Sequence, residues 1–144
     1  MTVHPSKCDG LDAAVARWFQ HVTDRGIFIT DERFVVCKWN QWLATQTGRS
    51  ETDIVGHQLF DLFPTLVERQ LDQHYRNALA GEVQILSERL HKYLLPITRN
   101  FHGVGLTEMA QTARIEPLTD GGAIVGTITV IEDVTERVVT EREL

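Results

Sequence analysis

Long apolar runs are missing from this chain of 144 residues. No apolar stretch approaches the roughly 20 residues that a membrane-spanning helix needs, and the N-terminus lacks the basic and apolar regions of a secretion signal. We therefore expect a cytoplasmic segment that makes no contact with a membrane. Cysteine is scarce too. Cys8 and Cys37 lie far apart in no spacing typical of a metal site, so we expect two free thiols.

Positive charge is also in short supply. The chain has 14 Lys and Arg residues against 20 Asp and Glu, which gives a formal net charge of −6. Binding along a nucleic-acid backbone needs clustered Lys and Arg, so we expect no nucleic-acid partner. With 42% hydrophobic and 24% charged residues, and without an internal repeat or a Pro/Gly/Ser-rich linker, the chain fits one globular domain with a single core.

Spaced catalytic motifs are absent as well. The sequence contains no recognisable nucleophile with its base, no paired carboxylates and no metal-ligand set. Pairs such as Asp72 with His74, or Ser87 with His91, are better explained as surface polar residues. The expectation is a domain that is not an enzyme.

An amphipathic helix is predicted near the N-terminus, because apolar residues recur at helical spacing over residues 11–22. Its apolar face contains Trp18 and Phe19 and must be covered. Two short β-rich runs follow, over 26–30 and 34–39, and are typical of a hairpin.

Short helices are predicted across the middle of the chain. One covers 40–47 and ends at Gly48, Ser50 and Asp53 begin a further turn, and a longer helix covers 66–80.

Three long strands are then predicted over 83–94, 109–118 and 123–131. Gly121 and Gly122 form the tight turn between the last two, and 95–107 is a loop. The order of elements predicts an α+β fold, a five-stranded antiparallel sheet with short helices on one face, flanked by an N-terminal helix and a C-terminal exit helix.

The end of the chain has the features of a signal exit. Residues 123–131 are apolar or β-branched at nearly every position, which is typical of a strand covered on both faces. Charged residues dominate 136–144 and predict the start of a helix. Asp133 and Thr135 lie at the joint, where a carboxylate and a hydroxyl can cap the first amides of that helix. Such a joint is suited to passing a signal out of a domain.

With these elements in place, the sequence resembles the PAS family. The similarity covers about residues 26–137. It is carried by spaced segments in the family's order: Gly26, Ile27, Phe28 and Asp31; Asn40, Leu43, Thr47, Gly48, Ser50, Asp53, Ile54, Val55 and Gly56; Leu62, Phe63 and Pro64; Ala78, Leu79, Gly81 and Glu82; Asp133, Val134 and Thr135.

The resemblance implies a sensory input domain of a bacterial signalling protein, such as a histidine kinase of a two-component system or a diguanylate cyclase. The expected parts are an N-terminal helical flank over 1–23, a PAS-like sensor over 24–135, and the start of a signalling helix over 136–144. Asp133 and Thr135 would pin the last strand to that helix, and the effector would lie outside this chain. The first alternative is a dimerisation module without a ligand.

The cofactor is left unknown. Flavin photosensors of the family carry a reactive Cys in a helix where this chain has residues 56–63 without a thiol, so flavin–thiol photochemistry is not expected. Haem sensors of the family commonly place a His three residues before an aromatic on the long helix, but Asp72 stands three before Tyr75. His74 is the other possible iron ligand, so a haem-binding gas or redox sensor is the second alternative. The competing interpretation of His74 is a half-buried, hydrogen-bonded histidine.

A candidate ligand-binding face lies on the strand predicted over 83–94. Alternation puts Ser87, Arg89, His91 and Tyr93 on one face, which by analogy with the family points toward the helices. Such a set suits a small polar or anionic ligand, because Arg binds a carboxylate with two hydrogen bonds. The alternative is a solvated hairpin end that binds nothing. The candidate set is completed by Gln111, Thr129, His74 and Trp42.

The opposite face of the sheet is expected to form an interface. Ile128 and Val130, with Leu86 and Leu90, would otherwise leave an apolar patch exposed. The helix that carries Trp18 and Phe19 is the expected cover, from the same chain or from a partner, so a homodimer is predicted.

Overall fold

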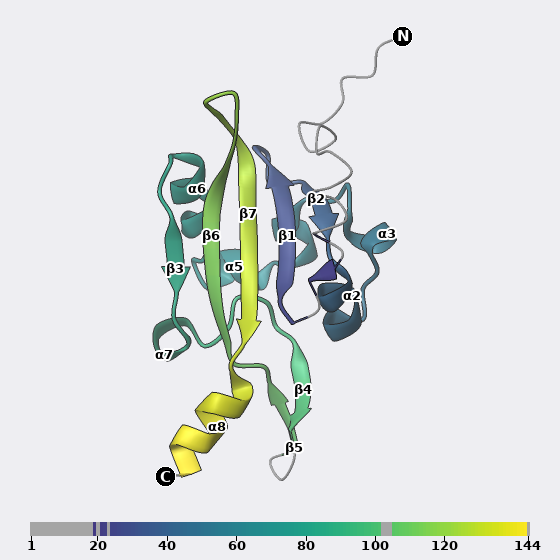
Figure 1. The fold of residues 1–144 in the computed structure, drawn as a ribbon, viewed down its shortest axis with the longest axis vertical. Helices are drawn as coiled ribbons and strands as arrows, with labels where there is room; N and C mark the ends of the chain where they lie inside the picture. Colours follow the sequence, from purple (N-terminus) through teal and green to yellow (C-terminus); the bar gives the residue numbers. More distant parts are fainter. Residues whose placement is uncertain (1–18, 20, 23, 102–104, 144) are drawn as a thin grey trace.

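Five antiparallel strands form the central sheet of the computed structural model, which describes residues 19, 21–22, 24–101 and 105–143 (Figure 1). The strand order is β2-β1-β7-β6-β3. The bounds are Gly26–Asp31 for β1, Val36–Trp39 for β2, Gln84–Leu86 for β3, Gln111–Asp120 for β6 and Ala123–Asp133 for β7. The predicted α+β class and five-stranded sheet are confirmed.

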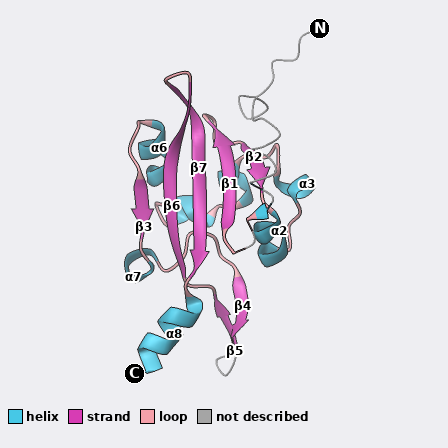
Figure 2. Ribbon diagram, viewed as in Figure 1, coloured by secondary structure: helices cyan, strands magenta, loops and turns pink. Residues whose placement is uncertain are grey.

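Helices cover one face of this sheet, and a last helix extends from its end (Figure 2). Two further strands, β4 and β5, pair with each other apart from the main sheet. The bounds are Gln41–Thr47 for α2, Glu51–Ile54 for α3, Leu59–Leu62 for α4, Thr65–Glu68 for α5, Asp72–Leu79 for α6, Glu88–His91 for α7, Thr98–Phe101 for β4, Gly105–Glu108 for β5 and Thr135–Glu143 for α8.

Local signals account for the first helices. Asn40 caps α2 by accepting a hydrogen bond of 3.2 Å from the Leu43 amide, and Gly48 ends the helix in the left-handed region. Ser50 and Asp53 form a reciprocal capping box at α3. These features agree with the elements that the sequence predicts.

The helix predicted over 66–80 is divided into α5 and α6. Gln70 adopts φ 61°, the Leu71 amide donates to the Leu66 carbonyl, and the Gln70 amide donates to the Val67 carbonyl. This pair of bonds is a Schellman motif, which normally has glycine in the left-handed position. Because glutamine occupies it here, the sequence contains no sign of the break.

The long strand predicted over 83–94 is wrong. Strand β3 has only three residues, and Ser87 then caps α7 by accepting a hydrogen bond of 3.4 Å from the Leu90 amide. Alternation of polar residues concealed a serine cap followed by a helical turn. The loop predicted over 95–107 is also wrong in part, since it contains the β4–β5 hairpin.

Glycine is needed at two places along β7: in the turn before it and at the point where it passes β1. Gly121 and Gly122, both with positive φ, form the predicted turn between β6 and β7. At Gly126 the β1 backbone comes so close that a Cβ would lie 1.9 Å from the Thr30 carbonyl oxygen. Only glycine permits this pairing of β7 with β1.

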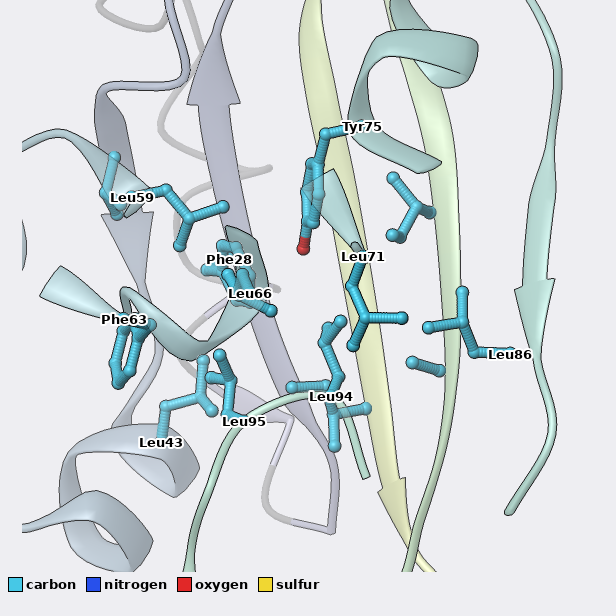
Figure 3. Packing of buried hydrophobic residues seen from close by; sticks show 14 of the residues in the cluster. Phe28, Leu43, Leu59, Phe63, Leu66, Leu71, Tyr75, Leu86, Leu94 and Leu95 are labelled. Atoms are coloured by element: carbon cyan, nitrogen blue, oxygen red, sulfur yellow. The ribbon is translucent and has the colours of Figure 1, made fainter. Parts of the chain in front are cut away.

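The main core fills the space between the sheet and its helices (Figure 3). Its largest fully buried side chains include Trp39, Tyr75 and Phe28. The sheet contributes Ala113 and Ile115 from β6 and Ile131 from β7. Leu86, predicted for the outer face, is buried in this core, whereas Leu90 is 81% exposed on α7.

Candidate functional site

The exit junction, where β7 passes into α8, is held by Asp133 and Thr135. Asp133 Oδ1 accepts a hydrogen bond of 2.9 Å from the Thr135 amide, the first amide of α8. Asp133 Oδ2 forms an ion pair of 2.5 Å with Arg99 Nη1. Thr135 Oγ1 accepts a hydrogen bond of 3.0 Å from the Ala110 amide. The Asp133 carboxylate therefore contacts both the start of α8 and Arg99 of the strand β4.

Both external partners of the junction belong to the β4–β5 hairpin or its base. Arg99 lies in β4, and Ala110 follows β5. The Val134 amide also donates to the Ala110 carbonyl at 2.8 Å. Two of these contacts involve backbone atoms of residue 110, so the hairpin base and the start of α8 cannot move independently without breaking them.

Gln111 anchors the chain segment that leads into the hairpin. Its Oε1 accepts hydrogen bonds from the Leu94 and Leu95 amides at 3.0 and 3.2 Å, and its Nε2 donates to the Leu95 carbonyl at 2.8 Å. The residue is 2% exposed. A buried amide that uses both of its polar atoms in this way holds the backbone in place.

The inner face of the sheet presents Thr129 to α6. Tyr75 Oη and Thr129 Oγ1 lie 2.9 Å apart, and both residues are fully buried. Burial raises the pKa of the Tyr75 phenol, and the hydrogen bond with Thr129 acts in the opposite direction. Figure 3 shows Tyr75 among the side chains of the main core.

Ser87 and Arg89 do not share a strand face with His91 and Tyr93, because α7 replaces that strand. In a helical turn successive side chains rotate by about 100° rather than alternating. Ser87 is the cap of α7, and Arg89 is exposed on its surface. The predicted grouping of these four side chains through strand alternation is therefore wrong.

His91 and Tyr93 instead join a polar cluster with Arg69 and His74. The Arg69 guanidinium lies over the Tyr93 ring, with Cζ 4.2 Å from the ring centroid, and donates a hydrogen bond to the His91 carbonyl. The rings of His74 and His91 meet edge to face with centroids 5.4 Å apart. Burial and the neighbouring Glu108 raise the pKa of Tyr93, while Arg69 lowers it.

His74 and Trp42 make contacts within the protein. His74 Nδ1 and Gln84 Oε1 lie within 2.8 Å of each other, which ties α6 to the edge strand β3. Trp42 packs against the main core, and a Cβ at Gly26 would lie 2.9 Å from its ring.

The outer face of the sheet carries a second apolar cluster. Phe19 is 3% exposed and is grouped with Ile27 and Ile29, while Ile128 and Val130 pack against them. This places Phe19 on the face where the sequence predicts a cover. Trp18 lies outside the described residues.

Cys37 is disulfide-bonded, so the expectation of a free thiol is wrong for this residue. Its partner lies outside the described residues.

Among the residues described, no group of three or more His, Cys, Asp and Glu side chains has the geometry to hold a metal. None of the helices described has the length and hydropathy to cross a membrane.

A family model described as PAS fold matches residues 20–139. The chain belongs to the PAS family. No curated protein sequence matches it at a significant level.

Solved structures share the fold of this PAS domain at low identity. A PAS domain of a Colwellia psychrerythraea protein has 19% identity and a TM-score of 0.59, and the match covers 86% of this chain and 97% of that one. A sensory box sensor histidine kinase of Vibrio cholerae has 19% identity and a TM-score of 0.62, and the match covers 85% of this chain and 90% of that one. VqmA of Vibrio cholera, in a complex with ligand and DNA, has 20% identity and a TM-score of 0.61; the match covers 88% of this chain and 52% of that one.

Two residues of the exit junction were not indicated by the sequence of this PAS domain. Arg99 falls in a segment predicted to be a loop, and Ala110 contributes only backbone atoms. An arginine in a loop carries no pattern that names its partner 34 residues away. The sequence predicts the capping of α8 by Asp133, which is confirmed, but contains no signal for Arg99 or for the Ala110 amide that Thr135 binds.

Proposed function

We propose that this PAS domain is a sensory input domain of a bacterial signal-transduction protein, and that α8 carries its conformational signal to an effector. The exit junction is the observation that supports the proposal. Asp133 accepts a hydrogen bond from the first amide of α8 and pairs with Arg99 of the hairpin. A displacement of the hairpin would therefore change the direction or the order of α8.

The energies involved suit a switch. A helix cap contributes about 0.5–2 kcal/mol, and a partly exposed ion pair contributes about 1 kcal/mol or less. A free energy of this size holds one arrangement of α8 in most molecules, yet a modest difference in ligand affinity between two arrangements would reverse the preference.

The proposal also includes the kind of effector. A histidine kinase is the first choice and a diguanylate cyclase the second, and this domain itself has no catalytic role. A cytoplasmic location and the absence of a nucleic-acid partner remain predictions, as does the division of the chain at 1–23, 24–135 and 136–144.

A ligand-free dimerisation module is the second candidate function. The outer-face cluster favours it, since Ile128 and Val130 are only partly covered with Phe19 in place. An apolar face of this kind commonly marks an interface. In this reading the homodimer is the functional unit, and α8 would still determine how an effector is placed.

A chimera separates the two functions. The chain is fused through α8 to the catalytic core of a histidine kinase, and autophosphorylation is measured for wild type, Asp133→Ala and the neighbouring control Glu132→Ala, whose side chain is exposed. The sensory function predicts that only Asp133→Ala changes kinase activity while dimer mass stays constant. Equal activity in all three chimeras would contradict the sensory function.

A further inference from the structure

A cleft of about 310 Å³ lies between α7 and α8, beside the exit junction. Ser87 and Arg89 line it from the α7 side, Thr112 from β6, and Arg137 and Val138 from α8. Figure 1 shows both helices at the same end of the sheet. The cleft is therefore built from three elements, and one of them is the exit helix.

The positive charges of this cleft have few partners in the protein. Within the described residues, the exposed Arg89 side chain makes no hydrogen bond or ion pair. Arg137 has Glu141 at 4.0 Å, but their side chains are 58% and 60% exposed, so water and salt screen this pair strongly. Both guanidiniums are thus available to an anion.

The negative charges set the charge of a suitable ligand. Glu88 also lines the cleft, and its side chain is 9% exposed and lies 4.0 Å from Lys92. Arg89, Arg137 and the adjacent Lys92 carry three positive charges, and Glu88 and Glu141 carry two negative charges, so the net charge around the cleft is +1. A single anionic group balances it, whereas a second anionic group would approach the two glutamates.

We propose that this cleft binds a small monocarboxylate, whose carboxylate bridges Arg89 of α7 and Arg137 of α8. Guanidinium groups bind carboxylates through paired, charge-assisted hydrogen bonds. The hydroxyls of Ser87 and Thr112 suit a polar substituent of the ligand, and Val138 suits its carbon chain.

Such a ligand would act directly on the signal helix. It would connect α8 to α7 and to β6, and so favour the arrangement of α8 in which the cleft is formed. This step rests on the proposed sensory function, because it names the ligand class and the point of entry of the signal. The binding itself does not depend on an effector.

In the test, all 144 residues are present, and the protein is titrated with lactate and with butyrate at constant ionic strength. Binding is followed by amide NMR, and chloride is the control anion. Concentrations up to about 10 mM are needed, because ligands this small bind weakly. We expect shifts at the amides of Ser87, Thr112 and Val138. Arg89→Gln and Arg137→Gln should each weaken binding about tenfold or more, while Arg33→Gln, which makes the same charge change in an exposed turn, should leave it unchanged.

Three results would overturn the proposal: shifts that appear equally with chloride, shifts remote from the cleft, or affinity that neither cleft variant changes. Circular dichroism tests whether each variant is folded. The two arginines lie on different helices, so if one variant is unfolded the other still provides a test.

If the monocarboxylates bind in the cleft but kinase activity of the chimera does not respond, the sensory function fails and the site stands. If Asp133→Ala alters the kinase but no monocarboxylate binds, only the site fails.

Discussion

The Arg99–Asp133 ion pair is predicted to stabilise the exit junction by about 1 kcal/mol. The side chain of Asp133 is 18% exposed and that of Arg99 is 34% exposed, so solvent screening places the pair near the upper end of the range for surface pairs. Asp133 also caps α8, which is worth about 1 kcal/mol more. Asp133→Ala should therefore lower the free energy of unfolding by about 2 kcal/mol, and Arg99→Gln by about 1 kcal/mol.

A double-mutant cycle isolates the ion pair from the cap. Once Asp133 is replaced, Arg99 has lost this partner. The double variant Asp133→Ala with Arg99→Gln should therefore be no less stable than Asp133→Ala alone, which corresponds to a coupling energy of about 1 kcal/mol. Urea unfolding followed by tryptophan fluorescence measures the four stabilities, and concentrated salt should shrink the coupling. Hydrogen exchange should show faster opening of residues 137–141 in both Asp133→Ala proteins. Additive effects of the two substitutions would refute the assignment of the pair.

Three further predictions concern the core, the pH dependence and the outer face. Gln111→Ala should cost about 2–4 kcal/mol in urea unfolding, because two buried backbone amides over 94–95 lose their acceptor; the exposed control Gln41→Ala should cost less than half as much, and equal losses would exclude the anchoring role. Burial raises the pKa of Tyr75 above its ordinary value of about 10; the folded state thus holds this proton more tightly, so stability is complete below about pH 10 and falls as pH rises beyond it. Tyr75→Phe should show a weaker fall, and parallel pH profiles would contradict this. Deleting residues 1–23, which include Phe19, should expose the outer cluster and change the mass or the solubility in light scattering; an unchanged molecule would mean that this segment is not the cover.

The sequence determined the parts of the fold whose causes are local. The Asn40 cap, the Ser50–Asp53 capping box and the Gly121–Gly122 turn each depend on residues only a few positions apart, so their patterns are legible without tertiary structure. Asp133 and Thr135 were found because a strand-to-helix joint has its own cap chemistry.

Tertiary structure decided most of the chain from β3 to β6, apart from the local Ser87 cap of α7. The three-residue strand β3, the helical turn α7 and the β4–β5 hairpin replace one predicted strand and one predicted loop. In that segment Gln111 binds backbone groups at 94–95 from a distant strand, an interaction that no alternation pattern records. The same is true of the exit junction. Asp133 could be predicted from the sequence, but its partner Arg99 could not. Packing of the hairpin, and not sequence spacing, brings together two side chains that are 34 residues apart.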